Sequence, residues 1–294
     1  MKNIAILGCS NTEGSELYDK HLFDNYYDFR KDHPYGIIDI NQFNEHVKKV
    51  MKIYNHDMLK YADDCRKLAW PVKFKKLFVE GVNINDFSLG GSGIDYVQYL
   101  YNLNYMGQNA RFCKINEIRK RLKRKILESD LLIWQLTNEP RFYYTMKNEA
   151  LGMFCVGIQN FRMSFNNNPS NIPKWKRDIA VDYYEGIFDE QRYVQEKINF
   201  INLIISERKL RKKPTLFITI YTTDLKKHNF KQETGEYVFW SGYENGDIGI
   251  LGTILEKGIV PREIAFNKFK HPSEESHEAI ANYIFNFIKN NGLA

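Results

Sequence analysis

Long apolar segments, paired cysteines and a dominant charge are all scarce in this sequence. No apolar run approaches the roughly 18 residues needed to cross a bilayer, and one of the longest, Leu131–Leu136, is short. The four cysteines (Cys9, Cys65, Cys113 and Cys155) are scattered and form no C-x-x-C pair. They therefore predict neither a zinc site nor a disulfide scaffold. These absences argue against a membrane-spanning protein and a disulfide-stapled domain, and they favour a reducing compartment.

The amino terminus also lacks the features of a signal peptide. Met1–Gly8 has one lysine followed by a short apolar stretch, which falls short of the h-region of about 7–15 residues that signal peptides carry. A first β-strand that ends at a glycine turn accounts for the same residues. We therefore predict no signal peptide, no membrane span and a cytoplasmic location.

The composition is that of a folded domain with a mild basic excess. The chain has 294 residues, of which 43% are hydrophobic and 15% aromatic, and its formal net charge is +6. This apolar fraction is ample for a packed core and excludes disorder as the main state. Many basic residues lie in Arg119–Lys125 and Arg208–Lys213. The run Arg119–Lys125 is more typical of a solvated helix face than of a nucleic-acid site, so nucleic acid is not an expected partner. The sequence predicts no oligomeric state.

Short apolar runs alternate with amphipathic stretches along the chain. The strand-like runs are Ile4–Leu7, Val82–Ile84, Leu131–Leu136, Leu216–Tyr221 and, less clearly, Ile264–Phe266. The helical stretches are Asn44–Lys67, Ile115–Leu127, Gln191–Arg211 and His277–Ile288, the last with Ile280, Ile284 and Ile288 on one face. This alternation predicts an α/β fold whose mostly parallel sheet is covered on both faces. We predict one domain over residues 1–294, with insertions at about 140–190 and 222–258.

Parallel sheets place functional groups in the loops after the carboxyl ends of their strands. Four such loops contain polar or glycine-rich sequences, and each also has an ordinary structural explanation. GCSNTEG contains Ser10, which can present its hydroxyl at a helix N-terminus or can simply cap that helix. DFSLGGSG can expose a backbone N–H donor at Gly91 or Gly93, or form a plain tight turn. QLTNEPR contains Asn138, and KFKHPSEESH contains His271 just before a helix.

Taken together and in this order, the four blocks resemble the SGNH (GDSL-like) hydrolase superfamily. The resemblance covers core blocks from residue 4 to about 288. It implies a flavodoxin-like three-layer α/β/α sandwich with a five-stranded sheet, and neither metal nor cofactor. Ser10 matches the nucleophile and His271 the general base. The oxyanion hole would consist of the backbone N–H groups of Ser10 and Gly91 and the side-chain amide of Asn138. This constellation implies ester hydrolysis through an acyl-serine intermediate.

The sequence departs from the family pattern at three positions. Cys9 stands where the family usually has Asp, Gln135 replaces a usual glycine, and Lys268 occupies the position of the triad acid. The histidine can then work in a Ser–His dyad, or a carboxylate from elsewhere can orient it, with Glu274, Glu263 and Asp247 as unranked candidates. Alternatively, the protein is a catalytically impaired binding or structural relative, because nearby lysines lower the basicity of an imidazole.

The substrate is predicted only as a small-molecule or carbohydrate ester. Aromatic residues near the third block and in the second insertion can stack on sugar rings, or they can be ordinary packing residues. They are Trp134, Phe142, Tyr143, Tyr144, Trp240 and Tyr243. Together with the family resemblance, they suggest a short-acyl esterase, such as one that removes O-acetyl groups from a carbohydrate.

Overall fold

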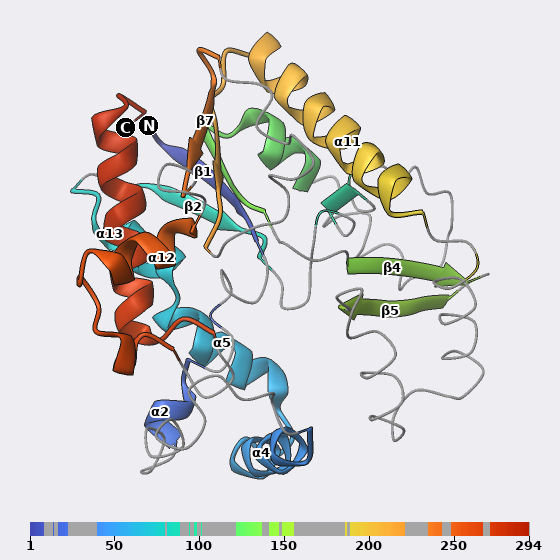
Figure 1. Cartoon of the computed structure of the whole chain (residues 1–294), viewed down its shortest axis with the longest axis vertical. Helices are drawn as coiled ribbons and strands as arrows, with labels where there is room; N and C mark the ends of the chain where they lie inside the picture. Colours follow the sequence, from blue (N-terminus) through green and yellow to red (C-terminus); the bar gives the residue numbers. More distant parts are fainter. Residues whose placement is uncertain are drawn as a thin grey trace.

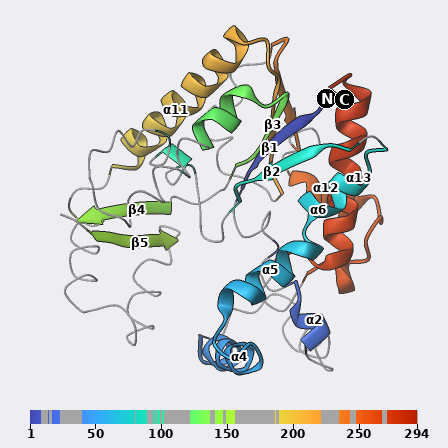
Figure 2. The ribbon, with the colours of Figure 1, turned by 180° about the vertical axis from the view of Figure 1, so that it is seen from behind.

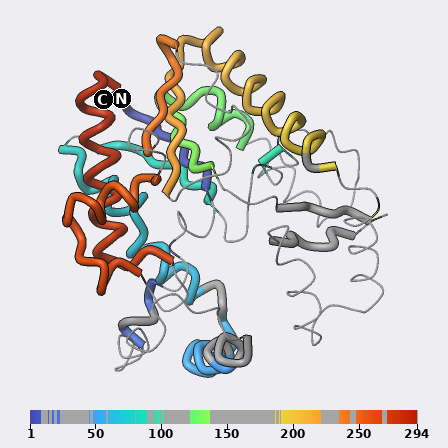
Figure 3. Tube along the Cα trace, viewed as in Figure 1, coloured from blue at the N-terminus to red at the C-terminus, as the bar shows by residue number. Residues whose placement is uncertain are grey.

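Parallel strands form the central sheet of the protein. The computed structural model (Figure 3) describes residues 1–8, 14, 17–22, 40–79, 81–88, 94, 97–98, 101, 122–136, 141–146, 149–155, 186, 189–220, 235–242, 248–266 and 271–293. The sheet consists of β1 (Asn3–Leu7), β2 (Asn83–Asp86), β3 (Leu131–Gln135), β6 (Thr215–Ile218) and β7 (Val238–Ser241). The order of these five strands is β2-β1-β3-β6-β7, and each neighbouring pair is parallel. The predicted α/β fold is therefore confirmed.

Helices cover both faces of this sheet (Figures 1 and 2). The helix α11 (Glu190–Leu210) lies on one face together with the helical residues 122–128. The helices α6 (Trp70–Lys76), α12 (Gly249–Glu256) and α13 (Glu274–Asn290) lie on the other. Successive side chains of a strand point to opposite faces. Consequently Ala5 and Leu7 pack towards α11, whereas Ile4 and Ile6 pack towards α13.

The apolar face of each long helix is buried as its periodicity predicts. Ile201 and Ile205 of α11 are almost completely buried in the layer on one side of the sheet. Ile280, Ile284 and Ile288 of α13 are fully buried in the layer on the other side. Both helices therefore pack on the sheet through these isoleucines.

The helix predicted over Asn44–Lys67 is wrong as a single helix. The structure has α4 (Ile40–Ile53) and α5 (Met58–Leu68), separated by a turn. Asn55 and His56 in this turn have φ values of 48° and 65°, and asparagine tolerates this left-handed conformation better than most residues. Asp57 then caps α5 by accepting a hydrogen bond from the backbone N–H of Lys60.

The strand predicted at Ile264–Phe266 is also wrong. Arg262–Ile264 form a short 3₁₀ helix, η2, which follows Pro261, and Phe266 makes only an isolated bridge to Pro272. The fifth strand is β7, which pairs with β6. Both β7 and α12 fall within the stretch 222–258 that the sequence suggested as an insertion, so this part of the stretch belongs to the core.

The remaining described elements lie outside the main sheet. The strands β4 (Arg141–Met146) and β5 (Glu149–Cys155) form a separate antiparallel pair within the stretch 140–190. The short helix α2 (Asp19–Leu22) follows the first glycine-rich block. In the described part of the chain, every helix is too short or too polar to cross a bilayer.

Candidate functional site

The carboxyl ends of β2, β1 and β3 lie beside one another, because β1 is the middle strand of the three. The register pairs Ile6 with Asp86 and Leu7 with Trp134. The residues that follow these three strands therefore start from one edge of the sheet. The second, first and third predicted blocks begin at this edge, and their predicted site residues are Gly91, Ser10 and Asn138.

Those three residues lie outside the described part of the chain, as do Cys9, Gly93 and Lys268. The structure fixes the ends of the segments that contain them. Gly8 and Gly14 bracket the Ser10 segment, and Ser88 and Ile94 bracket the Gly91 segment. His271 is itself described and is half-buried.

Polar residues lie at the level of Gly8 on the face of the sheet that α13 covers. Extending the register places Gly8 beside Gln135 of β3, one step beyond the last pair, and beside Ser88, two steps beyond the last pair with β2. Gln135 is only 4% exposed. Ser88 is also buried, and its hydroxyl has no hydrogen-bond partner within the described residues. The chain therefore leaves β1 next to two buried polar residues, Gln135 and Ser88.

Gly14, at the end of the Ser10 block, packs tightly against the junction of α5 and α6. Its φ is +79°, and a Cβ added there would lie 2.7 Å from Leu17 Cδ1 and 2.8 Å from the Cβ of Ala69. A larger residue would meet both a left-handed backbone and these close contacts. The sequence therefore needs glycine at this position, which attaches the end of the Ser10 segment to α6.

The amino end of α6 is bound in turn to α13. Ala69, the N-cap residue of α6, makes no side-chain capping bond. Instead, the N–H of Trp70 donates to Nδ1 of the fully buried His277, at a distance of 2.9 Å. His277 therefore connects α13 to α6. The segments that contain Ser10 and His271 are thus each attached close to the same helix end.

The loop that contains His271 is closed at its base. The carbonyl oxygen of Ala265 accepts hydrogen bonds from the N–H of Ser273 at 2.9 Å and from Oγ of Ser276 at 2.7 Å. Phe266 and Pro272 pair across the loop in an isolated bridge. Ser273 also caps α13 by accepting a hydrogen bond from the N–H of Ser276. His271 therefore lies next to two residues with fixed backbone positions.

Two of the three candidate carboxylates for orienting His271, Glu274 and Glu263, lie in the described part of the chain. Glu274 has two side-chain partners, with Oε2 3.3 Å from His21 Nε2 and Oε1 3.5 Å from Lys73 Nζ. Lys73 also pairs with Glu278 at 3.0 Å. Glu274 therefore links α13 to α2 and α6. Glu263 is exposed in η2, and Asp247 lies outside the described residues.

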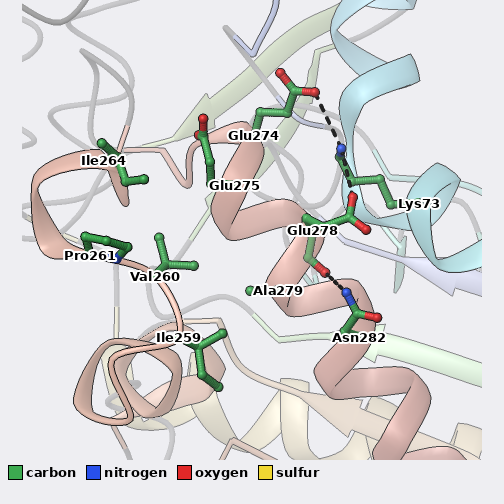
Figure 4. A pocket seen from close by; sticks show the side chains of 10 residues that line it. All are labelled: Lys73, Ile259, Val260, Pro261, Ile264, Glu274, Glu275, Glu278, Ala279 and Asn282. Atoms are coloured by element: carbon green, nitrogen blue, oxygen red, sulfur yellow. Dashed lines mark hydrogen bonds and ion pairs between the residues drawn. The ribbon is translucent and has the colours of Figure 1, made fainter.

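A cavity of about 500 Å³ lies beside this ion-pair group, between α13 and the segment that precedes the His271 loop (Figure 4). Ile259, Val260, Pro261 and Ile264 line one side, and polar residues of α13 line the other together with Lys73. None of the described lining residues is a serine, cysteine or histidine. The cavity therefore offers no nucleophile or imidazole for the predicted hydrolysis.

Two of the aromatic residues proposed to stack on sugar rings belong to the core. Trp134 is 1% exposed and lies 5.9 Å from the ring of Phe217. Trp240 is 8% exposed and stacks on the same phenylalanine at 4.5 Å. The packing explanation is therefore correct for both tryptophans. Tyr243 and the side chains of residues 142–144 lie outside what the structure describes.

Sequence reasoning missed the residues that support the site. Gly14, Ser276 and His277 hold the ends of the two key segments, yet none was assigned this role from the sequence. His277 lies three residues before Ile280 on the buried face of α13, so helical spacing could have identified it. Among the described residues, no group of three or more His, Cys, Asp or Glu side chains converges as a metal site.

Comparisons with known proteins give no family assignment. No family model matches the sequence, and no curated protein matches it. In structure, the chain is similar to the lipase Lip_vut3 from a goat rumen metagenome, with a TM-score of 0.40 and 11% identity over 100% of this chain and 99% of that one. A second solved structure has a TM-score of 0.36 and 12% identity, over 99% and 98% of the two chains. These similarities are too low to carry an argument about activity, which must rest on this chain's own residues.

Proposed function

We propose that the protein is a serine hydrolase of the SGNH type, which cleaves a carboxylic ester through an acyl-serine intermediate. The observation that carries the proposal is the strand order β2-β1-β3, which starts the Gly91, Ser10 and Asn138 segments at one edge of the sheet. The anchored loop of His271 supports it, because Gly14 and His277 attach the serine and histidine segments to the same end of α6.

In the proposed reaction, Ser10 Oγ attacks the ester carbonyl carbon while His271 accepts the hydroxyl proton. The oxyanion of the tetrahedral intermediate receives hydrogen bonds from the backbone N–H groups of Ser10 and Gly91 and from the amide of Asn138. Losing one such donor typically costs about 2.7–4 kcal/mol of barrier. The intermediate expels the alcohol, which takes the proton from His271. Water, deprotonated by His271, then releases the acid and restores Ser10.

The proposed site works either as a Ser10–His271 dyad or with a carboxylate from elsewhere in the chain that orients His271. Glu274 is paired with His21 and Lys73, and Lys268 stands at the family's usual acid position. The pairing of Glu274 and the lysine at position 268 also favour a second candidate function, that of a catalytically impaired binding protein with the same fold. Turnover that depends on Ser10 distinguishes the enzyme from this alternative.

We expect the purified protein to hydrolyse p-nitrophenyl acetate and to release acetate from acetylated saccharides. Ser10→Ala and His271→Ala each remove a reacting group, so kcat/KM should fall by at least about 10³-fold. Ser206→Ala and His56→Ala, at exposed positions of the same residue types, should retain the wild-type value. Cleavage of longer acyl esters without acetate release would contradict the short-acyl substrate. Turnover that survives Ser10→Ala, or is absent from the wild type, would contradict the hydrolase.

A further inference from the structure

Ser276 makes a hydrogen bond that differs from the usual bond of a helical serine or threonine. Such hydroxyls commonly donate to the carbonyl four residues earlier in their own helix. Thr253 in α12 does so, with Oγ1 3.0 Å from the carbonyl oxygen of Gly249. Ser276 in α13 instead donates to the carbonyl oxygen of Ala265, eleven positions earlier and on the far side of the His271 loop.

This bond joins the two ends of the loop. Ala265 and Ser276 are both 0% exposed, so water does not compete for the donor or the acceptor. The Ala265 carbonyl also accepts the N–H of Ser273, and the two bonds measure 2.7 Å and 2.9 Å. We call these two hydrogen bonds to the Ala265 carbonyl the clamp; one comes from the side chain of Ser276 and the other from the backbone of Ser273. His271 lies inside the clamped segment, two residues before Ser273.

We propose that Ser276 is a positioning residue, which holds the His271 imidazole at the distance and angle that proton transfer from Ser10 requires. The inference rests on the proposed hydrolase function. The two hydrogen bonds to the Ala265 carbonyl restrain the backbone that carries the imidazole, because Ser273 follows His271 by two residues. A displacement of a reacting group by about 1 Å can lower a rate by about 10²-fold. Loosening this clamp should therefore affect the chemical step more than ester binding.

The test compares Ser276→Ala with Thr253→Val, each of which removes one buried hydroxyl that donates to a backbone carbonyl. Both should lower Tm by a similar amount, about 2–4 °C. With p-nitrophenyl acetate, Ser276→Ala should lower kcat by about 10–100-fold and leave KM within about twofold of the wild type. Thr253→Val should leave both constants unchanged, because its hydroxyl bond lies within α12.

The outcomes separate this inference from the function on which it rests. A Ser276→Ala variant with wild-type kcat and a lowered Tm would show a purely structural bond and overturn the positioning role. An equal loss of kcat in Thr253→Val would overturn it as well, because the effect would then follow general destabilisation. A wild type without Ser10-dependent turnover overturns the proposed function, and the positioning role with it.

Discussion

Replacing Arg208 by methionine is expected to lower the free energy of unfolding by about 3–5 kcal/mol. Arg208 is fully buried near the C-terminus of α11. Its guanidinium donates to the backbone oxygens of Ile126, Ser129 and Pro214 and to the hydroxyl oxygens of Ser129 and Thr215. One side chain thus joins α11 to the end of the helical residues 122–128 and to the start of β6.

The expected loss is large because methionine leaves buried carbonyl groups without a donor. Each unsatisfied buried acceptor costs about 1–3 kcal/mol. Burial lowers the pKa of the Arg208 guanidinium to about 9, while Asp130 acts in the opposite direction. The group is therefore still charged at neutral pH, and its bonds to the carbonyls are charge-assisted. Lysine is not an adequate substitute, because one ammonium cannot reach acceptors arranged around a planar guanidinium.

Guanidinium chloride unfolding of the Arg208→Met variant measures the effect, and Arg211→Met is the matched control. Arg211 is exposed in the following turn and pairs with Glu207 at 3.3 Å, so its loss should change stability by less than about 1 kcal/mol. Equal stability of the two variants would show that the buried hydrogen bonds of Arg208 contribute little.

Acidification is expected to destabilise the protein through His277. Burial, with smaller contributions from His271 and Lys73, lowers the pKa of His277 to about 3. Its Nδ1 accepts a hydrogen bond from Trp70, so the folded protein keeps the neutral ring with the proton on Nε2. The unfolded chain takes up a proton near pH 6.5, and the free energy of unfolding therefore falls as pH decreases from about 6.5 towards 3. At pH 5 the loss relative to pH 8 should be about 2 kcal/mol.

Urea unfolding at several pH values tests this prediction with His277→Asn. Asparagine can still accept the hydrogen bond from Trp70 but does not titrate, so the part of the pH dependence that belongs to His277 should disappear. His56→Asn, at an exposed position, should keep the wild-type dependence on pH. A wild-type slope in His277→Asn between pH 5 and pH 8 would contradict this assignment.

The sequence predicts the parts of the fold that local pattern determines. β1 and β3 are short apolar runs with most residues completely buried, and the isoleucines of α13 recur at helical spacing. β7 was missed because four residues, VFWS, resemble an apolar loop until β6 pairs with them. Residues 264–266 are equally apolar, but Ile264 is the last residue of the 3₁₀ turn after Pro261, and Phe266 makes only an isolated bridge to Pro272. Whether each segment forms a strand depends on pairing with a distant part of the chain, and a local sequence pattern does not contain that information.

The candidate site likewise has residues that the sequence suggests and contacts that only the structure reveals. Ser10, Gly91, Asn138 and His271 come from short blocks that the sequence contains in a recognisable order. The supporting contacts join residues far apart in the chain, such as Trp70 with His277 and Ala265 with Ser276. Their partners become known only once α6 and α13 have packed together on the sheet. The sequence therefore suggests candidate reacting groups, whereas the contacts that hold their segments become visible only in the folded structure.

Labelling with a fluorophosphonate probe, followed by peptide mass spectrometry, tests the central claim that His271 activates Ser10 as a nucleophile. The wild type should carry the phosphonyl group on Ser10, and Ser10→Ala should carry none. His271→Ala should react about 10²–10⁴-fold more slowly, because the serine has lost its general base. An unlabelled wild type, a label on another residue, or an undiminished rate in His271→Ala would contradict the account.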